Sequence, residues 1–190
     1  WVRHLEGLQS LYRQEANRLE VAPLCVQSSM KAIVKRLAKE IERVKEQIKV
    51  HIEKHPDLHN KKKLLETIPG IGEATIAQVL AFMGNIEDFK NAKQLAAFVG
   101  LNPKQRQSGT SVQGRAKLSK MGNSNLRRAF YMPAVSAKNH NPVMKDFAAR
   151  LEAAGKAKML IIGAIMRKLV HIIYGVLKSG KAFNAQLALG

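Results

Sequence analysis

The chain is short of acidic residues, and the shortage is concentrated in one long stretch. No aspartate or glutamate occurs between Asp88 and Asp146, whereas the same stretch contains many lysines and arginines: Lys90, Lys93, Lys104, Arg106, Arg115, Lys117, Lys120, Arg127, Arg128, Lys138 and Lys145. A solvated surface normally mixes charges of both signs, so an acid-free basic stretch indicates a polyanionic partner. The whole chain of 190 residues has a formal net charge of +18, which favours nucleic acid first and an anionic membrane surface second.

Other scarcities exclude further classes of protein. The single cysteine, Cys25, excludes an internal disulfide and is typical of a reducing compartment. Aromatic residues make up 5% of the chain, which argues against the stacking platforms of single-strand-binding domains. We expect no signal peptide and no membrane span, because the best apolar run, Met159 to Val176, is interrupted by Arg167, Lys168 and His171.

Hydrophobic periodicity predicts an all-α protein with a coiled-coil region at residues 1–60 and a compact helical domain at residues 61–190. The coiled coil is indicated by an apolar seam with alternating steps of four and three residues: Met30, Val34, Leu37, Ile41, Val44 and Ile48. Such a narrow seam needs a partner helix, which is either the preceding helix folded back or a second copy of the chain. Because the chain starts at Trp1 within an amphipathic helical pattern, we expect it to be a fragment of a longer polypeptide.

In the second region the sequence predicts helices with one long irregular segment between them. The helices are expected at Asn91 to Val99, Leu126 to Lys138, Pro142 to Ala154 and Lys158 to Lys178. Pro133 should kink or split the second of these helices. No convincing strand series is visible, so Lys104 to Asn123 is predicted to be rich in loops.

The segment Ile68-Pro69-Gly70-Ile71-Gly72, followed by an apolar helical run, is the pattern of a helix-hairpin-helix motif. Its glycines permit positive φ and let a phosphate approach the backbone N–H groups at the next helix N-terminus. Such motifs bind the nucleic-acid backbone without reading sequence. The alternative interpretation is a tight turn between two helices that binds nothing.

Ser108 is the candidate nucleophile, because its hydroxyl can attack a phosphodiester if nearby cations neutralise the phosphate and a base takes the proton. No Asp, Glu or His lies near Ser108 in the sequence, so a structural serine in a turn is the competing interpretation, and Ser111 is a neighbouring candidate. The candidate nucleic-acid contacts are Pro69, Gly70, Gly72, Lys104, Arg106, Arg115, Lys117, Lys120, Asn123, Arg127 and Arg128.

A metal site in this chain is not expected. His51, His55 and His59 are spaced four residues apart, which could place three ligands on one helical face. Pro56 interrupts that helix and no thiol accompanies the histidines, so a solvated helix end is the alternative.

These motifs, in this order, resemble the C-terminal transposase domain of the insertion-sequence "one-ten" family, the DEDD transposases that include the Piv-type DNA invertases. The resemblance rests on the following residues: Ile68 to Gly72, Phe89, Ala92 to Pro103, Ser108-Gly109, Gly122-Asn123, Leu126-Arg127-Arg128 and Arg167-Lys168-Leu169. It covers most of Leu64 to Lys178, and the preceding coiled coil is also similar to the linker of that family.

The resemblance implies a recombinase guided by a structured bridge RNA. A serine at the position of Ser108 would form a covalent link to a DNA 5′ phosphate. An N-terminal acidic domain, absent here, would bind Mg²⁺ and complete the site from another protomer. We therefore expect a bacterial cytoplasmic protein, nucleoid-associated when bound, that forms a homodimer or larger assembly and does not recombine DNA as this fragment alone.

Two further functions compete with this one. A non-catalytic helical nucleic-acid-binding module would bind in the same salt-dependent way, with Ser108 structural. A basic membrane-surface protein is less favoured, because the cations concentrate in one irregular segment and not along a long amphipathic face.

Overall fold

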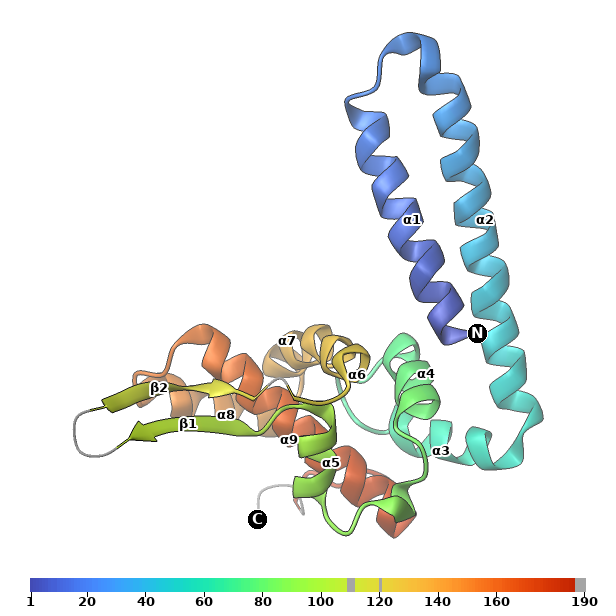
Figure 1. Cartoon of the computed structure of the whole chain (residues 1–190). Coiled ribbons are helices and arrows are strands. Elements are labelled where there is room, and N and C mark those ends of the chain that lie inside the picture. Colours follow the sequence, from blue (N-terminus) through green and yellow to red (C-terminus); the bar gives the residue numbers. More distant parts are fainter. Residues whose placement is uncertain (109–111, 120, 187–190) are drawn as a thin grey trace. The chain divides into compact units, whose positions relative to one another are not determined.

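The computed structural model describes residues 1–108, 112–119 and 121–186, with residues 104–108 and 112–117 described by their backbone alone (Figure 1). The chain divides into two compact units, Trp1–His59 and Asn60–Gly190. Helices dominate both units, which confirms the helical fold class.

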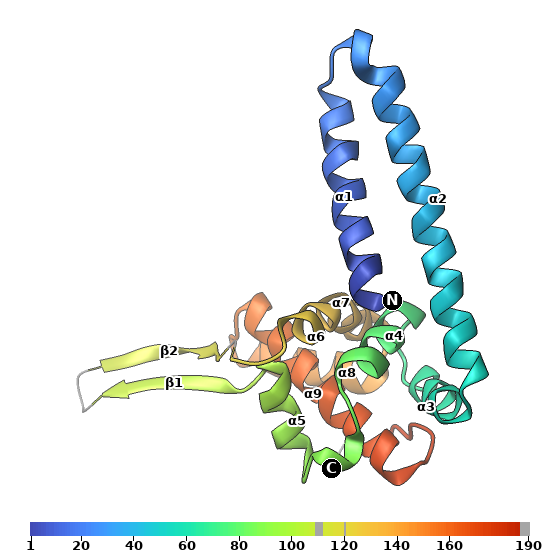
Figure 2. The same cartoon turned by 45° about the vertical axis from the view of Figure 1, so that its right-hand side comes forward.

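The first unit is built on two long helices, α1 (Val2–Glu20) and α2 (Leu24–Lys54), which run antiparallel and pack on one another (Figure 2). Three residues of the predicted seam, Ile41, Val44 and Ile48, are buried, and Leu8 is buried on α1. The partner of the seam within this chain is therefore the first helix folded back. Coiled-coil supercoiling and pairing with a second copy stay predictions.

The outer positions of α2 are charged and solvated. Glu40 pairs with Arg43, and Glu42 pairs with Lys45 at 2.7 Å, each three residues apart on the helix surface. The hydrogen bond from Arg43 lowers the pKa of the Glu40 carboxyl group. Such exposed pairs contribute little, because water and salt screen them, so the buried seam stabilises this unit more.

The second unit begins at Asn60, within α3 (Pro56–Glu66). The remaining elements, in chain order, are α4 (Glu73–Phe82), the 3₁₀ helix η1 (Ile86–Asp88), α5 (Ala92–Val99), β1 (Pro103–Ser108), β2 (Val112–Leu118), α6 (Ser124–Ala129), α7 (Tyr131–His140), α8 (Pro142–Ala153) and α9 (Lys158–Ser179).

Helix α9 is the centre of the second unit and contacts α5, α7 and α8. Its residues Ile161, Ile165, Leu169 and Ile173, four apart along the helix, are completely buried. Burying one such side chain contributes about 1.5–3 kcal/mol, so the four together stabilise the folded unit.

Helix α9 is also long and apolar enough to cross a membrane, judged by length and composition alone. This corrects the expectation that no run in the chain meets that test. Half of the apolar window is buried against other helices, and the core helix of a globular unit passes the same test. The packing of α9 therefore accounts for its apolar character.

Pro133 splits the predicted helix in two, as expected. The proline ring clashes with the carbonyl of the residue four positions earlier, which here is Ala129, the last residue of α6. The chain continues as α7, whose first turn contains Pro133. The missing N–H costs little there, because the first N–H groups of a helix have no partner within it.

The interpretation of Lys104 to Asn123 as loop is wrong for two segments. β1 and β2 pair antiparallel and form the sheet of the described chain. Both views show this β-hairpin running away from the helices of its unit (Figures 1 and 2).

Candidate nucleic-acid interface

Ser108 is the last residue of β1, where the described part of the β-hairpin ends. The register pairs Pro103 with Leu118, Lys104 with Lys117, Arg106 with Gly114, Gln107 with Gln113, and Ser108 with Val112. At about 3.3 Å per residue, Ser108 lies roughly 17 Å along the strand from Pro103. The β-hairpin therefore carries the candidate nucleophile well away from its own base.

Several predicted contacts have side chains that the structure does not describe. The backbone positions of Lys104, Arg106, Arg115 and Lys117 follow from the register, but their side chains and that of Ser108 are not described. Lys120 and the alternative nucleophile Ser111 lie wholly outside the described residues. Their roles stay predictions.

The base of the β-hairpin is held by three contacts to its own start and to α9. The Ser119 N–H donates to the Asn102 carbonyl oxygen at 2.8 Å, which closes the base. Arg167 Nη1 donates to Asn102 Oδ1 at 3.0 Å. Leu118 packs over Gly163, where an added Cβ would stand 3.4 Å from Leu118 Cδ1. Helix α9 thus fixes the start and end of the β-hairpin with one arginine and one glycine.

The helix before the β-hairpin ends in a Schellman motif. Gly100 has φ +80°, and the Leu101 N–H donates to the Ala96 carbonyl at 2.9 Å. Leu101 is fully buried. This ending sets the direction in which the chain leaves α5 and enters β1.

Gly122 and the predicted contact Asn123 form the return from β2 to α6. Gly122 has φ +146°, and a Cβ there would overlap the Phe98 carbonyl oxygen. The Asn123 N–H donates to that same oxygen at 2.7 Å, and Asn123 Oδ1 accepts from the Asn125 and Leu126 N–H groups as the N-cap of α6. Asn123 is thus a structural residue, whatever else it contacts.

The two adjacent arginines of α6 differ in exposure. Arg127 is half-buried, and its Nη1 donates to the Val99 carbonyl at 3.2 Å, at the C-terminal end of α5. A cation is favourable there, because the carbonyls of the last helical turn carry partial negative charge. Arg128 is exposed. Of this pair, Arg128 is the side chain available to a phosphate.

The turn predicted as a helix-hairpin-helix motif joins α3 to α4 and packs on α7 and α8. Gly70 has φ +95°, and a Cβ there would stand 2.9 Å from the Ala137 Cβ. Asn141, which is completely buried, donates from Nδ2 to the Pro69 carbonyl at 3.2 Å. Gly72 is exposed and precedes α4, whose first residue is the acidic Glu73. This geometry is a tight turn bound to other helices; its backbone-binding role stays a prediction.

These observations divide the predicted contacts into two groups that different elements hold. Asn123, Arg127 and Arg128 lie around the base of the β-hairpin, next to α5. The turn with Pro69, Gly70 and Gly72 is held by α7 and by Asn141.

A basic group on α9 was not among the predicted contacts. Arg167, Lys168 and His171 lie on one face of the helix, with Lys93 of α5 near His171. Burial, followed by the charges of Arg167, Lys93 and Lys168, lowers the pKa of His171. The sequence signal was present, because these three polar residues interrupt an otherwise apolar helix at spacings of one and three.

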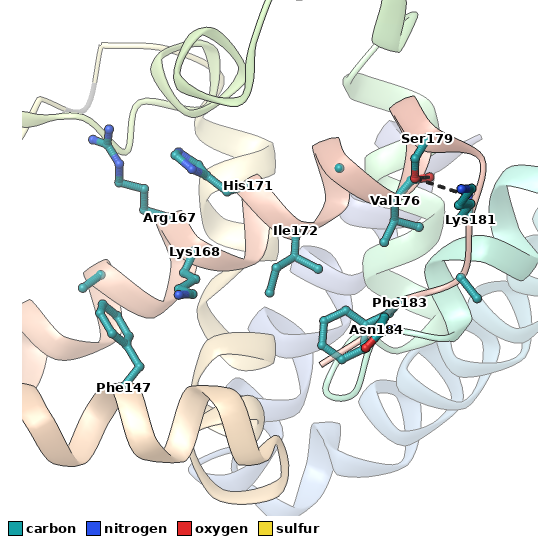
Figure 3. A pocket seen from close by; sticks show the side chains of 13 residues that line it. Phe147, Arg167, Lys168, His171, Ile172, Val176, Ser179, Lys181, Phe183 and Asn184 are labelled. Atoms are coloured by element: carbon teal, nitrogen blue, oxygen red, sulfur yellow. Dashed lines mark hydrogen bonds between the residues drawn. The ribbon is translucent and has the colours of Figure 1, made fainter. Parts of the chain in front are cut away.

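Figure 3 shows this basic group at one end of a cavity of about 720 Å³ between α8, α9 and the C-terminal segment. Phe147, Ile172 and Phe183 line its apolar part.

Metal ligands do not gather in the part of the chain that the structure describes, where no three His, Cys, Asp or Glu side chains come together. His51 and His55 stack with ring centroids 4.3 Å apart, and the His55 ring nitrogen Nδ1 lies 2.7 Å from the His51 carbonyl. His59 does not complete a site with them. The described residues therefore do not fit a Mg²⁺ site.

Comparison with known proteins adds independent evidence. Residues 62–149 match the family described as Transposase IS116/IS110/IS902. The chain is 39% identical over 133 residues to the pilin gene-inverting protein of Moraxella bovis, covering 70% of this chain and 41% of that protein. It is 28% identical over 134 residues to an uncharacterized 43.6 kDa protein of insertion element IS110 from Streptomyces coelicolor, covering 70% and 33% of the two chains.

A shorter match, 41% identical over 63 residues, links the chain to the transposase for insertion sequence element IS1111A of Coxiella burnetii and covers 33% of this chain and 17% of that one. The chain thus spans less than half the length of these relatives. The family match begins at Lys62 in α3 and runs through the β-hairpin into α8. From its ordered motifs, its helical second unit and these relatives, the chain belongs to the IS116/IS110/IS902 transposase family.

Proposed function

We propose that this chain is the DNA-binding, serine-bearing part of a transposase or DNA invertase. The observation that carries the proposal is the β-hairpin, whose strand β1 ends at Ser108 and whose base is fixed to α9 through Asn102 and Arg167. A nucleophile on a rigidly based projection can enter a partner site that holds the remaining catalytic groups. The names of the relatives, an inverting protein and a transposase, support a role in DNA rearrangement.

In the proposed reaction, Ser108 Oγ attacks the phosphorus of a DNA phosphodiester. The bond from phosphorus to the 3′ oxygen breaks, the serine proton goes to a base, and the released strand leaves as a 3′ hydroxyl. The 5′ phosphate remains as a phosphoserine ester, so the energy of the broken bond is kept for rejoining and no external energy source is needed. The cations of the acid-free stretch would stabilise the charge on the phosphate in the transition state.

The described residues of the β-hairpin and of its return to α6, 103–108, 112–119 and 121–123, include no Asp, Glu or His that could accept this proton. We propose that an acidic, Mg²⁺-binding domain outside this chain supplies it, from a second protomer paired through the α1–α2 unit. A structured guide RNA would select the target, because phosphate contacts alone carry no sequence information. The fragment alone would then bind DNA without cutting it.

A denaturing gel tests the catalytic part of this proposal. The full-length parent protein, its native guide RNA, Mg²⁺ and end-labelled donor DNA should give a covalent protein–DNA band. Ser108→Ala should abolish the band, whereas the matched control Ser119→Ala should keep it, because Ser119 uses its backbone N–H to close the β-hairpin base. A band that survives in Ser108→Ala would refute the phosphoserine step.

Fluorescence anisotropy with a labelled 30-base-pair duplex tests the binding part on the chain itself. The logarithm of the affinity should fall linearly with the logarithm of salt concentration, with a slope of about −0.9 per neutralised phosphate. Arg128→Gln should make this slope smaller by about one, whereas Lys49→Gln, on the outer face of α2, should not. If DNA binds in the second assay but the unaltered parent protein forms no covalent band, the chain is a binding module. If the band forms and survives in Ser108→Ala, Ser108 is structural and Ser111 becomes the candidate nucleophile.

A further inference from the structure

The cavity beside α9 has a basic part and an apolar part. One stripe of α9 lines it, and the stripe runs from Arg167 and Lys168 through Ile172 to Gly175 (Figure 3). Phe147 of α8 and Phe183 of the C-terminal segment complete the apolar part. All of these residues belong to the second unit, and the Phe183 N–H donates to Thr67 Oγ1 at 2.9 Å, which ties the C-terminal segment back to the end of α3.

The charge of this groove has one sign. Among the described residues that line it, Arg167, Lys168 and Lys181 are cationic and none is acidic. Lys168 Nζ stands 5.4 Å from the centre of the Phe147 ring, so its charge lies over an aromatic face. A groove with apolar walls, two cations at one end and Lys181 near the other suits a ligand that has a flat apolar part and an anionic part (Figure 3).

Gly175 gives a second, independent observation. It lies inside the 22-residue helix α9, where glycine costs roughly 0.5–1 kcal/mol relative to alanine. A Cβ added at Gly175 would meet nothing within 4 Å, so no neighbour in the described chain requires the glycine. Gly163 on the same helix contrasts with it, because Leu118 occupies the space there. The open space at Gly175 is room for a group that approaches from outside the chain.

We propose that this groove binds one unpaired nucleotide of a single-stranded nucleic-acid segment. The base lies over Gly175 and Ile172 beside Phe183, and its phosphate lies against Lys168 and Arg167. The guanidinium of Arg167 uses Nη1 for Asn102 and has further N–H groups for a phosphate. A cavity of about 720 Å³ holds a nucleotide with room to spare.

This inference rests on the proposed function, because it names a nucleic-acid subsite of the same unit. The scarcity of aromatic residues argues against stacking platforms that hold several bases. It does not argue against this groove, because a single base needs only one apolar slot. Arg167 joins the groove to the β-hairpin base through Asn102, so an unpaired nucleotide held here would anchor one strand next to the element that carries Ser108. Duplex distortion or a looped guide would both present such a nucleotide.

Position 175 allows a sharp test with the intact chain. Gly175→Leu places a large apolar side chain in the groove, begins it with a Cβ that meets nothing within 4 Å, and favours the helical state of α9. Gly175→Ala is the matched control, since it gives the same gain in helix propensity with one carbon atom. The ligands are fluorescein-labelled single-stranded dT12 and a labelled 20-base-pair duplex, each titrated at 100 mM salt by anisotropy.

Gly175→Leu should weaken dT12 binding at least tenfold and change duplex binding less than twofold, whereas Gly175→Ala should change neither more than threefold. Unchanged dT12 binding by Gly175→Leu would overturn the proposal, and so would an equal loss of dT12 and duplex binding. If the unaltered chain bound neither dT12 nor the duplex, that result would instead refute the proposed function. Labelled polyglutamate could instead bind the chain, lose affinity with Gly175→Leu, and resist displacement by unlabelled dT12. That result would assign an acidic peptide to the groove and also overturn the proposal.

Photo-crosslinking gives a readout that does not depend on the folding of a variant. A dT12 strand with 4-thiothymidine at every position, irradiated in complex with the unaltered chain, should mark peptides that contain Phe147 or residues 168–184. Crosslinks confined to the β-hairpin or to α6 would place the single strand elsewhere and overturn the proposal.

Discussion

Replacing Gly122 by alanine should destabilise the second unit more than replacing any exposed glycine with positive φ. At φ +146° an alanine is in a region that is nearly exclusive to glycine, which costs about 1–3 kcal/mol. Its Cβ would also overlap the Phe98 carbonyl and stand 2.7 Å from the Gly100 nitrogen, so backbone must move, at a further cost of about 1–3 kcal/mol. The expected total of roughly 2–6 kcal/mol is a large part of the 5–15 kcal/mol of a typical domain.

Gly155→Ala is the matched control, because Gly155 has φ +68° but meets nothing within 4 Å. It should cost only the left-handed backbone conformation, about 1–2 kcal/mol. Hydrogen exchange with mass spectrometry measures both variants in the second unit alone, by following the peptides of α5 and α6. The reasoning is refuted if Gly122→Ala loses no more protection than Gly155→Ala.

Three further changes test other contacts. Asn141→Ala removes the N-cap of α8 and the hydrogen bond to the turn before α4, and should lower the free energy of unfolding by about 2–4 kcal/mol in denaturant melts. The control Asn91→Ala removes an exposed N-cap and should lower it by about 1 kcal/mol. Equal losses would contradict the structural role of the buried Asn141. Asn102→Ala leaves the carbonyl that binds Ser119 but removes the partner of the α9 arginine, so β2 amides should exchange faster while α7 amides do not, and unchanged β2 exchange would count against the anchoring role. Burial and nearby cations lower the pKa of His171 in the folded chain, so the unfolded chain binds more protons below about pH 6.5 and stability should fall as the pH drops from 6.5. His171→Gln should flatten this dependence of stability on pH. Proton NMR should find the pKa of His171 in the folded chain below 6.5.

Helices with a strong apolar period could be predicted from the sequence. The stripe from Ile161 to Ile173 predicts a buried α9, and the structure buries it completely. The seam of α2 is likewise buried at Ile41, Val44 and Ile48. The effect of Pro133 follows from sterics alone, since a proline ring affects the carbonyl four residues earlier in any helix.

The β-hairpin could not be predicted, because its sequence lacks the alternation of apolar and polar residues that marks a half-buried strand. Between Lys104 and Lys117 the apolar residues are Val112 and Ala116, too few for the alternation that identifies a half-buried strand. Its base depends on contacts between distant residues, such as Asn102 with Arg167 and Leu118 with Gly163. Sequence spacing holds no signal for such pairs.

The groove beside α9 was missed for a similar reason. Phe183 reaches it through a bond to Thr67, more than a hundred residues earlier in the chain. Gly175 has no meaning in the sequence until the space around it is known. The candidate functional residues that sequence patterns indicate, Ser108 and the basic stretch, belong to one contiguous segment.

The closed base of the β-hairpin has a consequence for how this family can vary. The chain leaves the helical unit at Asn102 and returns at Ser119, and these two residues are joined by a 2.8 Å hydrogen bond. Lengthening or shortening the segment between them changes the closure entropy only slowly, by about 0.6 kcal/mol for each doubling of length. The β-hairpin is therefore an exchangeable cassette: a designer could graft the corresponding segment of another recombinase between these two positions and expect the helical scaffold to fold as before.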